Sequence, residues 1–287
     1  GLQWNLADTL RLQNRLEEAV KHYEMAIGIQ PNYYEAYFNL GVSLELLEQL
    51  EEASISYRKA TVIEPTKVDA FINLGVTLHR LNDIDKAIIN YKKALDLGHD
   101  SAELNCNLGA ALQTKGYFDE AVRMYRAALR LNPNHVDSHN NLGTALWELG
   151  RNSNRSKDGA TFTTLMDEAI HSLQQAVAMR PDKAQLHYNL GNVYDEIGRQ
   201  KKSADSYLEA ISLQPDYGEA WHNLNRIMKA LKFLESAEDT QPNFTKALFD
   251  RIKQYSASFA MLEYYLDRFD PQLSETKYDA AMATLPP

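Results

Sequence analysis

The stretch that decides the fold is residues 34–67, which read YEAYFNLGVSLELLEQLEEASISYRKATVIEPTK. Its apolar and small residues fall into two groups at helical spacing, followed by a closing proline: Tyr37, Leu40, Gly41 and Leu44, then Ala53, Tyr57 and Ala60, then Pro65. Such spacing is typical of amphipathic helices, and proline ends a helix or begins the next one. The stretch therefore predicts one antiparallel pair of helices.

The same pattern recurs along the chain. The triplet Asn-Leu-Gly begins at Asn39, Asn73, Asn107, Asn141 and Asn189. The first three intervals are 34 residues each, and the last is 48 residues, so one unit carries an insertion of 14 residues. We place the insertion at residues 151–164, as a polar loop between the two helices of the fifth unit. Residues Thr164 to Asp167 resemble a capping box that would begin the second helix again.

This pattern resembles the tetratricopeptide repeat over about residues 1–241. The resemblance implies an all-α fold, a right-handed α-solenoid of about seven helix-turn-helix units. The expected units are 1–33, 34–67, 68–101, 102–135, 136–183 with the insertion, 184–217, and a degenerate unit 218–241.

Small residues at fixed positions of each unit predict close packing of the two helices. Counted from the start of a unit, Gly stands at position eight and Ala at position twenty, and we expect these two to face each other. The aromatic residue at position twenty-four would fill the wedge between the helices. In the third unit His99 replaces the usual proline, and Gly98 is expected to break the helix instead.

The seventh unit loses the pattern, because Asn225 stands where Gly is expected. Residues 242–287 form a separate segment in our division of the chain. Their apolar residues recur at helical spacing from Phe244 to Phe269, which predicts a long amphipathic helix followed by a tail. We expect this helix to cap the repeats by packing on Trp221, Leu224 and Met228, since an open repeat end needs a cover. Homodimerisation through the helix is the alternative.

Composition narrows the class of protein. The 287 residues are 44% hydrophobic and 24% charged, with a net charge of −9 and one cysteine. The acidic balance argues against nucleic acid and membrane surfaces as partners, and the lone Cys106 suits a reducing compartment, so we expect a cytoplasmic protein. Catalytic and nucleotide-binding motifs are absent, so we expect no enzyme activity and no cofactor. His135 and His139 are the best metal candidates, and we expect no metal there.

Asparagine occupies position six of all seven units: Asn5, Asn39, Asn73, Asn107, Asn141, Asn189 and Asn223. Asparagine is a mediocre helix former, so helix propensity does not explain the column. A side-chain amide offers both donors and an acceptor, and so it can hold a peptide backbone whatever the peptide's sequence. The column resembles the asparagine ladder of the superhelical repeat domain of O-linked N-acetylglucosamine transferase. The alternative is that these asparagines hydrogen-bond neighbouring helices.

Residues beside the ladder suggest what kind of segment it binds. Positions five and nine add candidate peptide contacts at Phe38, Ile72, Val42, Val76, Tyr188 and Asn192, apolar in the first half and more polar in the second. Position two is mostly acidic, with Glu35, Asp69, Glu103, Asp137 and Glu219. A ligand with hydrophobic side chains near one end and basic or polar groups elsewhere would suit this surface. Alternatively, the acidic residues stabilise helix N-termini through the helix dipole.

These observations predict a scaffold that binds an extended peptide segment of a partner protein in a concave groove. The runner-up is the substrate-docking arm of a larger enzyme, such as a glycosyltransferase, whose catalytic part lies outside this chain. The chain enters the first unit at its second position, which favours that larger context.

Overall fold

The computed structural model describes residues 2–152 and 159–237, with side chains as far as Met228. All regular structure in these residues is α-helical, and no cis peptide bond occurs there. The helices of these residues are α1 (Leu2–Leu12), α2 (Leu16–Ile29), α3 (Tyr34–Leu46), α4 (Leu50–Ile63), α5 (Val68–Arg80), α6 (Ile84–Asp96), α7 (Ala102–Thr114), α8 (Phe118–Leu131), α9 (Val136–Asn152), α10 (Gly159–Met179), α11 (Ala184–Glu196), α12 (Gln200–Leu213) and α13 (Gly218–Ala237).

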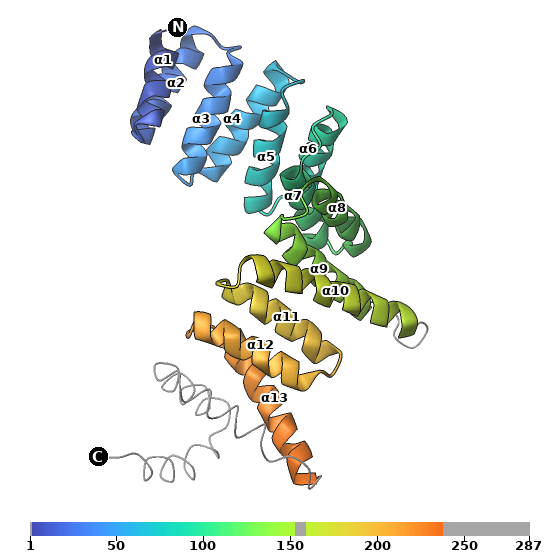
Figure 1. The fold of residues 1–287 in the computed structure, drawn as a ribbon. Coiled ribbons are helices and arrows are strands. Elements are labelled where there is room, and N and C mark those ends of the chain that lie inside the picture. The colour runs from blue at the N-terminus through green and yellow to red at the C-terminus, as the bar shows by residue number, and fades with distance from the viewer. Residues whose placement is uncertain (1, 153–158, 238–287) are drawn as a thin grey trace, which may run out of the picture. The chain divides into compact units, whose positions relative to one another are not determined.

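The chain divides into two compact units, Gly1–Asn141 and Leu142–Pro287, which we call the N-terminal and C-terminal halves. In the N-terminal half each helix from α1 to α7 packs on the next one in the chain, and in the C-terminal half each helix from α10 to α12 does the same (Figure 1). Helix α9 crosses the boundary between the halves. The expected all-α array of helical pairs is thus confirmed.

Glycine at position eight allows the two helices of a repeat to meet through a tyrosine ring. A Cβ atom added to Gly41, Gly75, Gly109 or Gly191 would lie 2.6 to 2.7 Å from the nearest ring carbon of Tyr57, Tyr91, Tyr125 or Tyr207. We expected position twenty to be the glycine's partner, but the tyrosine at position twenty-four lies closest. The four rings are almost fully buried, with at most 1% of their surface exposed.

Helix ends follow the predicted breakers. Helices α2, α4, α8 and α12 end one residue before the C-cap residues Gln30, Glu64, Asn132 and Gln214, each followed by proline. In the third repeat Gly98 adopts a left-handed conformation with φ of 86°, so it supplies the break as predicted. Ser101 then caps α7, because its side chain accepts a hydrogen bond from the Leu104 backbone nitrogen at 3.2 Å.

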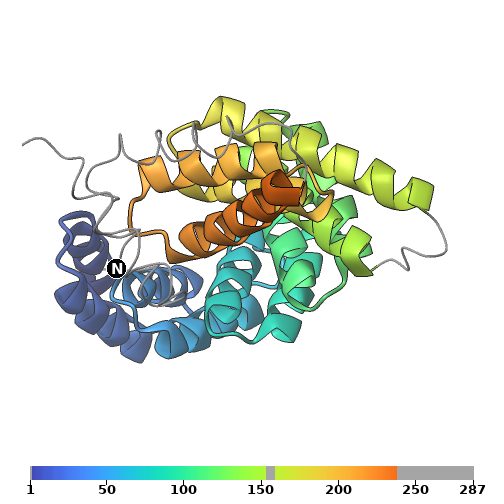
Figure 2. The same cartoon turned by 90° about the horizontal axis from the view of Figure 1, so that it is seen from below.

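The described residues of the insertion lengthen helices α9 and α10. Helix α9 continues to Asn152, and α10 begins at Gly159, five residues before the predicted start at Thr164. The prediction of a capping box at Thr164 is therefore wrong. Figure 2 shows α10 reaching beyond α11 and α12 at this end. The extra turns have an apolar side, because Phe162 and Met166 lie against Gly150.

The C-terminal half has its own core. Trp221, Leu224 and Met228 of α13 pack in one cluster with Tyr207, Leu208 and Ile211 of α12, together with neighbouring small residues. The capping helix and the dimerisation surface predicted for residues 242–287 lie outside the described residues. None of the helices in residues 2–152 and 159–237 combines the length and the apolar composition of a membrane span.

Candidate functional site

Every residue predicted to bind a peptide lies on an odd-numbered helix. The asparagines of position six come from α1, α3, α5, α7, α9, α11 and α13 in turn. Asn5 is exposed, Asn189 is 9% exposed, and the other five are half-buried. We call the exposed and half-buried residues at positions five, six and nine of the odd-numbered helices the first-helix face, and describe it separately for each half.

The apolar residues of this face are held by aromatic packing. The Phe38 ring stacks on Tyr34 with centroids 5.8 Å apart, and it lies at the same distance from the Tyr57 ring. Val42, Ile72 and Val76 are half-buried on α3 and α5. In the C-terminal half Tyr188 packs on Tyr207 and Tyr217, with centroids 5.8 and 4.9 Å away. These side chains are fixed by the fold and still present part of their surface to solvent.

Tyrosine hydroxyls connect one repeat to the next in the N-terminal half. The Tyr57 hydroxyl donates a hydrogen bond to Glu45 Oε2 at 3.0 Å, and it accepts one from Asn73 Nδ2 at 3.5 Å. Glu45 also forms an ion pair with Arg80 at 3.5 Å. One tyrosine thereby links two consecutive first helices, and the ladder residue Asn73 is part of that link.

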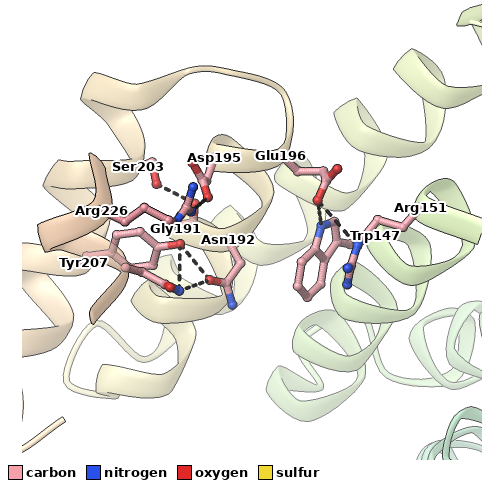
Figure 3. A network of polar contacts seen from close by, with 10 residues as sticks. Trp147, Arg151, Gly191, Asn192, Asp195, Glu196, Ser203, Tyr207 and Arg226 are labelled. Carbon is pink, nitrogen blue, oxygen red and sulfur yellow. Dashed lines mark hydrogen bonds and ion pairs between the residues drawn. The ribbon is translucent and has the colours of Figure 1, made fainter. Parts of the chain in front are cut away.

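The C-terminal half repeats this arrangement (Figure 3). The Tyr207 hydroxyl donates to Asn192 Oδ1 at 2.7 Å, while Asn223 Nδ2 donates to the same Asn192 oxygen at 3.1 Å and to the Tyr207 hydroxyl at 3.3 Å. Arg226 pairs with Asp195 beside them. Asn192 and Asn223 were predicted as peptide contacts, and here their amides hold two repeats together.

A second polar cluster joins α9 to α11 in the C-terminal half (Figure 3). Trp147 Nε1 donates to Glu196 Oε2 at 3.3 Å, and Arg151 Nε lies 3.5 Å from the same carboxylate. The Arg151 guanidinium also stands 5.0 Å from the centre of the Trp147 ring. On this half, many polar side chains at and beyond position nine bond to one another.

Three ladder amides in the N-terminal half have no such bond, those of exposed Asn5 and of Asn39 and Asn107. The side chains of Asn39 and Asn107 make no hydrogen bond to any residue that the structure describes, although both are half-buried. Asn141 instead donates to Cys106 Sγ at 3.8 Å and accepts from Asn140, and Asn189 accepts from Gln185 at 2.9 Å. The column that looks uniform in the sequence therefore contains engaged and unengaged amides.

Two models of known protein families match this chain. A family model described as TPR repeat matches residues 7–47, 77–116, 114–150 and 166–198, more than half of the chain. A second model, tetratricopeptide repeat, matches residues 34–67 and 184–217. The chain is a tetratricopeptide repeat protein. Arrays of this family generally mediate protein–protein interactions, and the fold is typically a non-catalytic scaffold.

Solved structures of other proteins share the fold. A crystal structure of YrrB, titled a TPR protein with an unusual peptide-binding site, has a TM-score of 0.56 and 23% identity, covering 70% of this chain and 96% of YrrB. PilF of Pseudomonas aeruginosa has a TM-score of 0.59 and 17% identity, covering 86% of this chain and 97% of PilF. A crystal structure of MamA has a TM-score of 0.54 and 21% identity, covering 62% of this chain and 96% of MamA. A search of curated proteins gives no match.

The buried tyrosine hydroxyls at position twenty-four stay protonated well above neutral pH. Burial raises the pKa of Tyr23 to about 12, and it raises the pKa of Tyr57, Tyr91, Tyr125 and Tyr207 as well. A protonated hydroxyl can donate to a carboxylate and accept from an amide at the same time. Sequence reasoning treated these tyrosines as wedges and missed the hydroxyl link. The available signal was that Tyr stands at position twenty-four in five repeats where Phe would fill the same space.

The histidines considered as metal ligands have partners within the fold. His135 Nδ1 lies 2.8 Å from Ser138 Oγ, and His139 Nε2 lies 2.9 Å from the Pro133 carbonyl oxygen. Within residues 2–152 and 159–237, no three His, Cys, Asp or Glu side chains form a group able to hold a metal ion. These two rings therefore serve the turn between α8 and α9.

Proposed function

We propose that this tetratricopeptide repeat array binds an extended segment of a partner protein on the first-helix face of its N-terminal half. One observation carries the proposal: Asn39 and Asn107 present half-buried amides without a hydrogen-bond partner among the described residues. An incoming backbone can therefore bond to both amides without first displacing a partner within the fold.

The chemistry of an amide suits a peptide backbone. Its nitrogen donates to a carbonyl oxygen and its oxygen accepts from a backbone N–H, so one asparagine can hold one residue without reading its side chain. Successive repeats are spaced by about the 10 Å of packed helices, and an extended peptide rises about 3.3 Å per residue. One asparagine would thus meet about every third residue of the bound segment.

The asparagines that form hydrogen bonds within the fold also support the proposal, by contrast with Asn39 and Asn107. Asn73 donates to Tyr57, and Asn223 donates to Tyr207, so these two have a structural role that needs no ligand. The same residue type at the same position is therefore held in the fold at some repeats and left for a ligand at others. Half-buried Phe38, Val42, Ile72 and Val76 supply the apolar contacts beside the two open amides.

The test uses the full 287-residue chain and a library of random 12-residue peptides displayed on phage. A selected peptide is added to 15N-labelled protein, and the side-chain amide signals of Asn39 and Asn107 are followed by NMR. We expect both signals to shift on binding. The signal of Asn90, whose amide bonds to the Lys86 carbonyl on α6, is the internal control and should stay in place. Binding that shifts Asn90 and leaves Asn39 and Asn107 unchanged would place the ligand elsewhere and refute the proposal.

A further inference from the structure

Four carboxylates stand in a row beside the first-helix face of the N-terminal half. Helices α3, α5, α7 and α9 each carry one acidic residue in the first turn: Glu35, Asp69, Glu103 and Asp137. All four side chains are exposed, and none forms an ion pair with another described residue. They recur once per repeat, in step with the asparagine ladder.

Cations do not neutralise this row. On the odd-numbered helices of the N-terminal half, Arg11 pairs with Asp8 at 2.7 Å, and Arg80 pairs with Glu45 and Glu48. Lys67, just before α5, places its ammonium 5.9 Å from the centre of the Tyr34 ring. The first turns of these four odd-numbered helices thus carry four unpaired carboxylates, with Lys67 as the lysine just before one of them.

We infer that the segment bound on this face is basic, with Lys or Arg recurring at every third residue and apolar residues between. The inference rests on the proposed function, which supplies the amides and the apolar contacts, and the charge row adds the choice of partner. The four carboxylates would repel an acidic segment, so the row also disfavours acidic partners.

The spacing favours a particular backbone shape. A polyproline II segment has three residues per turn and rises about 3.1 Å per residue, so residues three apart point the same way about 9 Å apart. That distance is close to the roughly 10 Å between successive repeats. A β-strand alternates sides at every residue, so residues three apart point opposite ways. A cation at every third position of a polyproline II segment would therefore meet one carboxylate per repeat.

The experiment measures fluorescence anisotropy of three labelled 12-residue peptides on the full chain: (Lys-Pro-Leu)4, (Gln-Pro-Leu)4 and (Glu-Pro-Leu)4. A fourth peptide has the composition of the first with its four lysines adjacent. We expect the periodic lysine peptide to bind at least tenfold more tightly than the glutamine peptide, and the glutamate peptide to bind most weakly. The lysine preference should shrink at high salt, because screening acts on exposed charges. The blocked-lysine peptide should lose most of the advantage.

Two quadruple variants separate ligand binding from helix stability. The face variant carries Glu35→Gln, Asp69→Asn, Glu103→Gln and Asp137→Asn. The control variant carries Glu17→Gln, Glu51→Gln, Glu52→Gln and Asp119→Asn, which remove the same charge from the first turns of α2, α4 and α8. Both variants lose the same helix-dipole contribution. Only the face variant should lose the lysine preference, to within about threefold of the glutamine peptide.

The outcomes distinguish this inference from the proposed function. Equal binding of the lysine and glutamine peptides, no binding by any peptide, or an equal loss in both variants would overturn the inference. If the lysine preference responds to the face variant but affinity is unchanged in Asn39→Ala with Asn107→Ala, the charge row stands and the role of the asparagines fails. If the two asparagine changes weaken all peptides equally, the ladder stands whatever the charge result.

Discussion

The Tyr57 hydroxyl accepts a hydrogen bond from Asn73 Nδ2, 3.5 Å away in the next repeat, and donates one to Glu45 of its own repeat. Tyr57, which packs between the two helices of one repeat, thereby holds the ladder residue Asn73 of the next repeat. Repeat proteins are stabilised by nearest-neighbour contacts, so this link acts on the interface that matters most for the array.

Removing that hydroxyl should destabilise the N-terminal half. We expect Tyr57→Phe to lower the free energy of unfolding by about 0.5–1.5 kcal/mol, the usual net value of a hydrogen bond. Tyr91→Phe is the matched control, because the Tyr91 ring is 1% exposed and its hydroxyl has no hydrogen bond to a described residue. Urea denaturation followed by circular dichroism measures both. Equal losses in the two variants would show that the Tyr57 link has no energetic role.

Glycine at position eight should not tolerate even a methyl group. A Cβ at residue 75 would lie 2.6 Å from the Tyr91 ring, so we expect Gly75→Ala to cost about 1–3 kcal/mol of stability through overpacking. Gly28, on α2, has no atom within 4 Å of its added Cβ apart from the backbone of its own helix and its chain neighbours. Gly28→Ala should raise stability by up to about 1 kcal/mol through helix propensity. Thermal melts compare the two, and a stable Gly75→Ala protein would disprove the close packing.

Stability should fall in strong alkali. Burial raises the pKa of Tyr23, Tyr34 and Tyr217 to about 12, whereas an unfolded tyrosine titrates near about pH 10. The folded state then holds more protons between these two values, so the stabilisation present below about pH 10 is lost as the pH rises toward 12. Tyrosinate absorbance and circular dichroism, recorded together, should show unfolding with the release of these protons. Titration of all tyrosines near pH 10 without unfolding would contradict the burial.

The sequence predicts the repeats but not the use of each ladder residue. Period and composition place the helices, because Gly, Ala and Tyr recur at fixed positions. Which asparagine is engaged is not set by the preceding tyrosine alone, because Tyr23 bonds to Asp8 of its own first helix while Asn39 in the next repeat has no hydrogen bond to a described residue. Tyr57 bonds to Glu45, and Tyr207 bonds to Asn192. Tyr91 finds no acceptor among the described residues, and Asn107 in the next repeat is left open.

The insertion shows a second limit. Its polar composition predicted a loop. Threonine is a weak helix former, and the stretch holds Thr163 and Thr164. In the structure their hydroxyls bond to the carbonyls of Gly159 and Ala160 within α10. Packing of Phe162 and Met166 at Gly150 overrides the local preference, and that contact joins residues on the two sides of residues 153–158.

The central claim is that Asn39 and Asn107 hold a bound peptide backbone, and one affinity measurement tests it most directly. A peptide selected on the full chain is titrated by isothermal calorimetry into wild type, into Asn39→Ala with Asn107→Ala, and into the control Asn90→Ala. At about 1 kcal/mol for each hydrogen-bonding amide, the double variant should bind roughly 30-fold more weakly with unchanged helix content, and the control should bind as wild type does. Wild-type affinity in the folded double variant would contradict the claim.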